Sequence, residues 1–172
     1  FPLNINLLMT MYFGTLVVIL DELSSEALRH ALREYKISVI IGVPRVWEML
    51  HKAIMNKINS SWITKKIFKI CQSINSKALS RLVFKKVYNE LGGSLRVMAS
   101  GGAKLDPEVS RDYLTLGLPM IEGYGLTETS PIIAFNKPTN VKAGTVGEII
   151  PDVEVKIAED GEILVKGANV MK

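Results

Sequence analysis

Apolar positions near the start of the chain fall into two kinds of pattern. Residues 26–35 place apolar side chains at helical spacing, and Ser24 or Ser25 can cap the helix that this spacing predicts. Residues 15–20 and 37–42 are instead largely apolar runs without alternation, which is typical of strands buried on both faces. A strand, a helix and a strand in succession predict a parallel α/β unit.

A second unit of this kind follows a long helical region. Pro44 suits the first turn of a helix, and two helical stretches extend to about Leu91. Residues 95–100 and 118–125 are again typical of buried strands, and a helix is expected between them over residues 106–117. This order predicts a second βαβ unit with parallel strands.

The pattern changes to a period of two near the end of the chain. Residues 153–157 and 162–166 alternate between apolar and polar side chains, and Asp160-Gly161 between them is a strong hairpin signal. The predicted fold class is therefore α/β, with βαβ units and a mainly parallel sheet flanked by helices. The start of an antiparallel β-rich subdomain is expected after it.

These patterns also suggest how the chain is organised. We expect an α/β part over residues 1–138, which contains a basic helical insertion at about residues 45–91, and a β-rich subdomain that starts within residues 139–172. The chain begins at Phe1 rather than at methionine and stops at Lys172 directly after a predicted strand. We therefore expect it to be an internal piece of a longer protein.

The apolar opening of the chain raises the possibility of a membrane-spanning helix, which needs about 20 apolar residues. Asn4, Asn6, Thr10 and Thr15 interrupt the run, and no basic segment precedes it. Gly14 is suited to end a helix. A buried helix followed by a buried strand is the favoured interpretation.

Composition narrows the class of protein. A hydrophobic content of 48% with 22% charged residues is typical of a folded globular domain and excludes a disordered chain. The single Cys71 cannot form an internal disulfide, and its apolar neighbours favour a place in the core over catalysis. A reducing, cytoplasmic location fits this composition.

Two loops carry candidate chemistry, and both follow strands of the second βαβ unit. Gly101 and Gly102 follow one strand, where a ligand could approach the backbone closely. Tyr124 lies between two glycines at the end of the next, which leaves its ring free to stack on a planar ligand. Thr127 and Glu128 offer a hydroxyl and a carboxylate, as expected where Mg²⁺ and phosphate are held together. Each feature also has a purely structural explanation: the glycines could form a tight turn, Tyr124 could pack under a turn, and Thr127 with Glu128 could cap a helix.

These loops also carry a resemblance to a known family. The stretches "GYGLTETSP" (residues 123–131), "SGGAKLDPE" (residues 100–108) and "GTVGEII" with "GEILVKGANVMK" (residues 144–150 and 161–172) resemble the adenylate-forming, AMP-binding superfamily. "GVPRVWEML" (residues 42–50), followed by a long helical insertion, is most similar to long-chain fatty acid CoA ligases. The resemblance covers essentially the whole chain.

The resemblance implies a reaction and a role for each matching residue. A fatty acid carboxylate would join the α-phosphate of ATP with release of pyrophosphate, and coenzyme A would then take the acyl group. The implied nucleotide-binding residues are Gly101, Gly102 and Ala103 on one side of the adenine, Tyr124 on the other, Glu122 and Gly123 at its edge, and also Gly125 and Thr127. The implied catalytic residues are Thr127, which would bond to the α-phosphate, and Glu128, which would bind Mg²⁺. Val43 and Pro44 would lie by the acyl pocket.

Several family motifs do not occur in the chain. The phosphate-binding loop that ends in lysine, the ribose-binding aspartate, the catalytic lysine and an upstream histidine motif are absent. Asp152 stands where the family usually has glycine, which suggests a turn variant. On this resemblance, the piece is expected to hold half an active site and to be inactive alone.

Basic residues are concentrated in one segment. Residues 45–86 contain ten lysines and arginines against Glu48 alone, a net charge of +9, whereas the other 11 basic and 16 acidic residues give −5. Trp62 and several isoleucines lie among the lysines, as in helices that lie on a membrane surface. An ordinary helix with solvated lysines is the favoured alternative. Nucleic-acid binding is not expected, because no motif that reads bases accompanies the charge.

Two classes of function therefore remain. The first is a piece of an ATP-dependent long-chain fatty acid CoA ligase, with Mg²⁺ as cofactor, ATP, fatty acid and coenzyme A as substrates, and possible peripheral membrane contact through the basic helices. The second is a non-catalytic basic module that docks on anionic membranes or polyanions. The two loops favour the first, and only the charge favours the second.

Overall fold

The structure is a computed structural model that describes residues 10–74 and 76–172. Its helices are α1 (Thr10–Tyr12), α2 (Ser25–Glu34), α3 (Pro44–Asn59), α4 (Trp62–Ile74), α5 (Lys77–Val83), α6 (Lys85–Glu90), α7 (Pro107–Thr115) and the short 3₁₀ helix η2 (Thr127–Thr129). Its strands are β1 (Val39–Gly42), β2 (Val97–Ser100), β3 (Met120–Tyr124), β4 (Ala134–Phe135), β5 (Glu148–Ile149), β6 (Val153–Ile157) and β7 (Ile163–Gly167).

The strands form a five-stranded sheet in the order β1-β2-β3-β4-β5 and a separate two-stranded sheet of β6 and β7. β1, β2 and β3 run parallel, and Met98 of β2 lies opposite Met120 of β3. β4 and β5 continue the sheet in antiparallel orientation. The predicted α/β fold class is confirmed, and so is the βαβ unit made of β2, α7 and β3.

The core lies between these parallel strands and the helices. Trp47 of α3 and Tyr113 of α7 are fully buried, and the Tyr113 hydroxyl donates a hydrogen bond of 2.7 Å to the Trp47 carbonyl oxygen. His51 and Asp112 join the same two helices, with 2.8 Å between Nε2 and Oδ2. Cys71 of α4 is buried in the same core, as predicted.

Capping residues fix where two of the helices begin. Ser24, rather than Ser25, caps α2, because its hydroxyl accepts a hydrogen bond of 3.1 Å from the Ala27 N–H. Asp106 caps α7 by accepting from the Glu108 N–H at 2.8 Å, and Pro107 occupies the first turn of this helix, which was expected over residues 106–117. Both caps satisfy donors that have no partner inside the helix.

The prediction for the first βαβ unit is wrong. Gly14 ends α1 with a φ of 61° as expected, but residues 15–20 form no strand, and Leu16 and Ile19 are 71% and 83% exposed. β1 lies at the edge of the five-stranded sheet and is not fully buried, since Val39 is 50% exposed. A strand needs a neighbouring strand to pair its backbone groups, and none of the described residues forms such a strand beside residues 15–20. Residues 1–9, which include most of the helix expected there, lie outside the described part.

The second helical stretch also differs from the prediction, because it divides into three helices. Ser76 caps the start of α5, where its hydroxyl accepts from the Leu79 N–H at 3.5 Å. Phe84 then ends α5 and precedes α6, and its N–H donates to the Ser80 carbonyl oxygen at 2.8 Å. The Phe84 side chain is buried, so the bend between the two helices anchors them on the core.

The predicted hairpin is confirmed. β6 and β7 pair in antiparallel orientation with Ile157 opposite Ile163, and Gly161 in the turn has a φ of 90°. Asp152 has a φ of 62°, a conformation that glycine adopts most readily, which agrees with its interpretation as a turn variant. The five-stranded sheet continues to Ile149, and the domain boundary near residue 138 stays a prediction.

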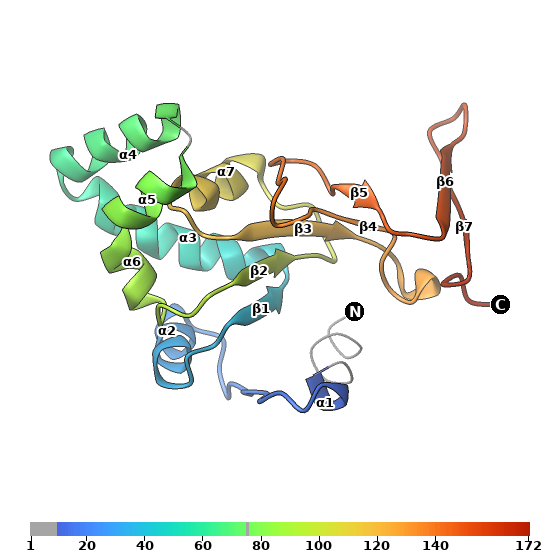
Figure 1. Cartoon of the computed structure of the whole chain (residues 1–172), viewed down its shortest axis with the longest axis horizontal. Helices are drawn as coiled ribbons and strands as arrows, with labels where there is room; N and C mark the ends of the chain where they lie inside the picture. Colours follow the sequence, from blue (N-terminus) through green and yellow to red (C-terminus); the bar gives the residue numbers. More distant parts are fainter. Residues whose placement is uncertain (1–9, 75) are drawn as a thin grey trace.

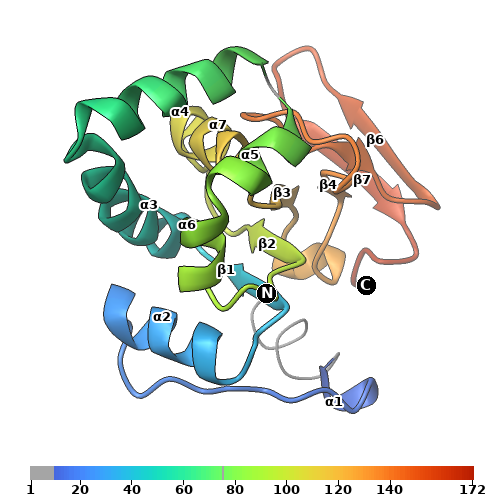
Figure 2. The ribbon, with the colours of Figure 1, turned by 60° about the vertical axis from the view of Figure 1, so that its left-hand side comes forward.

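The elements are distributed unevenly through the molecule. Helices α3 to α6 gather at one end of the parallel strands, and the β6–β7 hairpin lies at the other, as Figures 1 and 2 show from two sides. Across the described residues, none of the helices has the length and apolar character that crossing a bilayer requires.

Candidate functional site

The three parallel strands end at one edge of the sheet, and two predicted site segments meet there. The Gly101 N–H donates a hydrogen bond of 3.1 Å to the carbonyl oxygen of Gly42, the last residue of β1. A Cβ on Gly102 would lie 3.8 Å from the Val43 side chain, and Gly102 has a φ of 81°. Val43 and Gly102 are exposed and form one accessible surface, whereas Gly101 is buried. Ala103 is also exposed, whereas Pro44 is buried.

Tyr124 ends β3 beside this surface. β2 and β3 are paired up to Ser100 and Glu122, and β3 then continues through Gly123 and Tyr124, which pair with β4. The Tyr124 backbone is fixed from the other side, because its carbonyl oxygen accepts from the Ile133 N–H at 2.8 Å. Its side chain is half-buried, which leaves part of the ring accessible to a ligand.

The Glu122 carboxylate forms a hydrogen bond within the protein. Its side chain is buried, and one carboxylate oxygen accepts a hydrogen bond of 3.3 Å from the Gly144 N–H. The buried Asn136 reinforces this contact, since its Oδ1 accepts from the Lys142 N–H at 3.2 Å and its amide group donates to the Thr145 carbonyl oxygen. These bonds hold the loop of residues 142–145 against the end of β3.

The loop after β3 folds back tightly on itself. A Cβ on Gly125 would lie 1.9 Å from the Pro131 carbonyl oxygen, so only glycine fits there. The Thr129 hydroxyl accepts from the Leu126 N–H and donates to the Leu126 carbonyl oxygen, both at 3.0 Å. The loop therefore has a defined shape, and the hydroxyl that caps it belongs to Thr129 rather than to Thr127.

Thr127 and Glu128 are left exposed on this loop, in η2. Among residues 10–74 and 76–172, neither side chain forms a hydrogen bond or ion pair with another residue, and none bonds to the glycine loop. The same residues contain no group of three histidines, cysteines or acids that could enclose a metal. A single free carboxylate beside a hydroxyl fits Mg²⁺ held mainly by water and substrate phosphates, which is the usual arrangement for that ion.

The segment after β7 contacts the same loop, and sequence reasoning missed these contacts. The Asn169 side-chain amide donates to the carbonyl oxygens of Thr129 and Ile132, at 3.0 and 3.1 Å. The Met171 N–H donates to the Glu128 carbonyl oxygen at 2.8 Å. No local pattern reveals such contacts, because the partners lie about 40 residues apart in the sequence.

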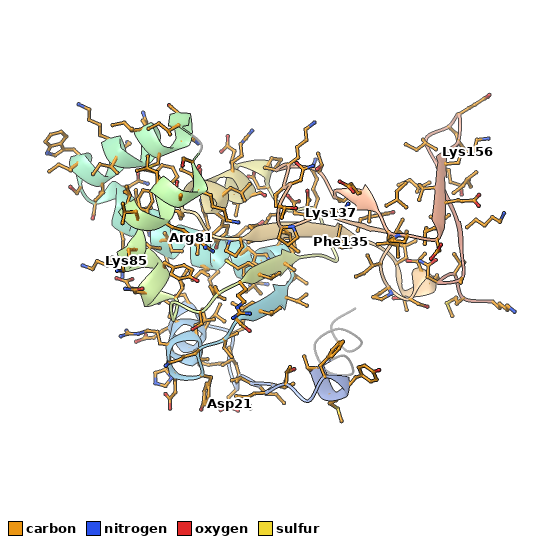
Figure 3. The ribbon with its side chains drawn as sticks, viewed as in Figure 1. Asp21, Arg81, Lys85, Phe135, Lys137 and Lys156 are labelled. Carbon is orange, nitrogen blue, oxygen red and sulfur yellow. The ribbon has the colours of Figure 1, made fainter. Side chains whose placement is uncertain are left out.

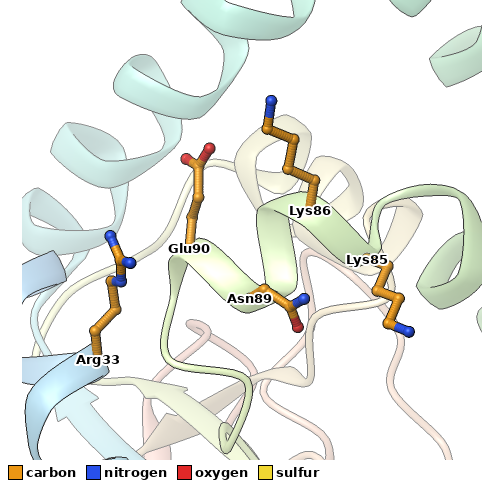
Figure 4. A pocket seen from close by; sticks show the side chains of 5 residues that line it. All are labelled: Arg33, Lys85, Lys86, Asn89 and Glu90. Atoms are coloured by element: carbon orange, nitrogen blue, oxygen red, sulfur yellow. The ribbon is translucent and has the colours of Figure 1, made fainter.

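Two surface depressions lie elsewhere, between α2 and α6. Arg33, Lys85, Lys86, Asn89 and Glu90 line one of them (Figure 4), and the other shares Arg33 and Glu90 with it. Lys57 pairs with Glu90 at 2.8 Å, and this contact lowers the pKa of Glu90. α2 and α6 lead into the amino ends of β1 and β2, so both depressions lie away from the motif loops. Interspersed charges of this kind are typical of solvated helix surfaces.

Some basic side chains of residues 45–86 contact other parts of the protein, and others are exposed to solvent. The Arg81 Nε donates to the Gly117 carbonyl oxygen at 3.3 Å, and its guanidinium lies 5.5 Å from the centre of the Tyr88 ring. Figure 3 shows Arg81 and Lys85 at the helical end of the molecule, whereas Lys137 and Lys156 lie toward the strands. Lys65, Lys66 and Lys69 of α4 are exposed.

Comparison with known proteins gives consistent matches along the chain. The chain is 32% identical to long-chain-fatty-acid–CoA ligase 1 of Saccharomyces cerevisiae, over 95% of its own length and 27% of the yeast protein. It is 35% identical to long-chain-fatty-acid–CoA ligase FadD15 of Mycobacterium bovis, over 81% of its length and 26% of that protein. The chain thus spans about a quarter of the length of these relatives.

The fold has close counterparts among solved structures. O-succinylbenzoate coenzyme A synthetase from Bacillus subtilis, solved with ATP and magnesium ion, matches with a TM-score of 0.64 at 21% identity, over 96% of this chain and 30% of that one. Residues 1–172 match the AMP-binding enzyme family throughout. The chain therefore belongs to the family of AMP-binding enzymes.

Proposed function

We propose that this chain is part of an ATP-dependent long-chain fatty acid CoA ligase, which first forms an acyl-adenylate and then transfers the acyl group to coenzyme A. The observation that carries the proposal is that β1, β2 and β3 run parallel, so the Val43 region, the glycine loop and the Tyr124 loop all follow the carboxyl ends of neighbouring strands. Similarity to ligases named for long-chain fatty acids supports the substrate class.

The residues at this edge have separate tasks in the proposal. The loop of Gly101, Gly102 and Ala103 lets the adenine approach the backbone on one side, while the Tyr124 ring stacks on the other. Gly123 and Gly125 carry no side chains, so they leave the edge of the adenine ring unobstructed. Glu122 acts indirectly, because its carboxylate already holds the loop at Gly144.

Thr127 and Glu128 supply the polar part of the site. The Thr127 hydroxyl donates a hydrogen bond to the α-phosphate, and the Glu128 carboxylate contributes one ligand to Mg²⁺. Bound there with the nucleotide, Mg²⁺ would neutralise charge on the phosphate oxygens. Val43 and Pro44 follow the end of β1 and would lie by the acyl pocket.

The substrate class can be tested on the complete enzyme that contains this chain. We expect purified enzyme with ATP, Mg²⁺ and coenzyme A to form palmitoyl-CoA, with a kcat/KM at least about 10-fold above that for acetate, because each buried methylene is worth about 0.8 kcal/mol. Mass spectrometry of the thioester product and release of pyrophosphate give independent readings. Equal turnover of acetate and palmitate would contradict the long-chain assignment.

A second candidate role is contact with an anionic membrane surface through α4. Trp62 is 75% exposed, and Ile63, Ile70 and Ile74 are also exposed on this helix. At 100° per residue, these isoleucines lie on a stripe next to the one that carries Lys66 and Lys69. An apolar stripe beside a basic one is the arrangement that binds at a lipid interface.

We expect weak, salt-sensitive binding of the complete enzyme to vesicles that contain phosphatidylserine. Replacing Lys65, Lys66 and Lys69 by glutamine should weaken it, since each lysine near such a surface is worth about 1 kcal/mol and is screened within a Debye length. A triple variant of Lys104, Lys142 and Lys156 removes the same charge elsewhere and is the matched control. If both triple variants reduce the amount of enzyme that cosediments with the vesicles equally, α4 has no specific role in membrane contact.

A further inference from the structure

The hairpin and the loop of the candidate site are joined by a small set of hydrogen bonds. The side-chain amide of Asn169 donates to the carbonyl oxygens of Thr129 and Ile132, which lie on either side of Ser130 and Pro131 in the loop. The Met171 N–H donates to the carbonyl oxygen of Glu128 itself at 2.8 Å. Figure 1 shows the segment after β7 beside the short helix that follows β3.

The surroundings of Asn169 indicate that its side chain has a fixed position. Its Oδ1 is buried, and a Cβ on Gly167 would lie 2.5 Å from that atom, so Gly167 leaves the space that the amide occupies. Val170 closes the turn, because its N–H donates to the Gly167 carbonyl oxygen at 3.2 Å. The turn after β7 therefore presents both Asn169 and the Met171 N–H to the loop.

We propose that Asn169 is a positioning residue, which holds the Thr127–Glu128 loop in the orientation that brings the carboxylate and hydroxyl to the metal and the phosphates. This proposal rests on the proposed function of the loop. Glu128 and Thr127 are exposed and have no side-chain partner in the described residues, so their positions depend on the backbone that carries them. Three of the hydrogen bonds that fix this backbone come from the turn after β7.

The first test measures the loop directly, by hydrogen exchange of the complete enzyme without substrates. In Asn169→Ala, we expect the amides of Thr129, Ser130 and Met171, which are hydrogen-bonded in this loop and its contact with the turn, to exchange at least about 10-fold faster. Gly167→Ala, which would displace the Asn169 side chain, should have the same effect. Asn140→Ala replaces an exposed asparagine elsewhere and should leave these amides unchanged. Unaltered exchange in both Asn169→Ala and Gly167→Ala would overturn the proposal.

The second test separates positioning from packing. Asn169→Asp keeps the shape of the side chain but removes both donated hydrogen bonds, so it should resemble Asn169→Ala. We expect pyrophosphate release to fall by about 10- to 100-fold, which is the scale for a small displacement of catalytic groups. Transfer from presynthesised palmitoyl-adenylate to coenzyme A should change less than about threefold, because it needs no contact with the departing phosphates.

The outcomes of the two tests are distinguishable. If Asn169→Asp releases pyrophosphate at the wild-type rate, Asn169 only fills space and the positioning role is wrong. A wild-type enzyme that forms no palmitoyl-CoA would contradict the proposed function instead, and the exchange measurement would then decide alone whether Asn169 fixes the loop. Equal losses in both half-reactions would indicate general damage to the fold and would also overturn the proposal.

Discussion

Replacing Glu128 by glutamine in the complete enzyme is expected to lower the rate of adenylate formation by on the order of 10²–10³. The change keeps the size of the side chain and removes its charge. The expected loss corresponds to about 3–4 kcal/mol in the transition state, at about 1.36 kcal/mol per factor of ten. The fold should survive, because Glu128 is exposed and its side chain supports no other residue in the described part of the chain.

Separate assays of the two half-reactions test this expectation. Pyrophosphate release should show the full loss, whereas thioester formation from presynthesised acyl-adenylate should be affected less, since no pyrophosphate leaves in that step. Circular dichroism checks that the variant is folded. Near-normal pyrophosphate release by Glu128→Gln would remove this carboxylate from the metal site and leave the loop as a structural turn.

Replacing Gly125 by alanine should be the second most damaging change. The added Cβ would lie 1.9 Å from the Pro131 carbonyl oxygen and 2.8 Å from the Ile132 Cα, and both are backbone atoms that cannot move aside cheaply. The loop that carries Thr127 and Glu128 must therefore shift. A displacement of about 1 Å can cost 10²-fold in rate, and overpacking costs roughly 1–3 kcal/mol of stability.

Thermal unfolding and pyrophosphate release measure these two effects on Gly125→Ala. Gly123→Ala is the matched control for stability, because its Cβ would meet its nearest neighbours only at an ordinary 3.7 Å. We expect the melting temperature of Gly123→Ala to stay near that of the wild type while that of Gly125→Ala falls. Equal melting temperatures would show that the loop accommodates the methyl group, and a normal rate would show that its shape does not matter for the reaction.

Local sequence patterns determined much of the fold. The βαβ unit of β2, α7 and β3 was predicted because a buried strand, a proline at a helix start and glycine after a helix each carry a short-range signal. The hairpin at Asp160-Gly161 was predicted for the same reason, since a two-period pattern and a turn signal act within a few residues. The loop with Tyr124 and Glu128 was singled out as a candidate site from residue types alone, and the family resemblance is confirmed by the match along the whole chain.

Other features depended on contacts between distant residues, which only the tertiary structure decided. Residues 15–20 have the composition of a strand, but the described chain supplies no partner strand, so they form none. The family resemblance implies a place for Glu122 at the edge of the adenine, and only the structure shows that one of its carboxylate oxygens accepts a hydrogen bond from the Gly144 N–H. The hydrogen bonds from Asn169 to the Glu128 loop could not be predicted from the sequence either, because a hydrogen bond to a backbone carbonyl 40 residues away leaves no pattern in either segment.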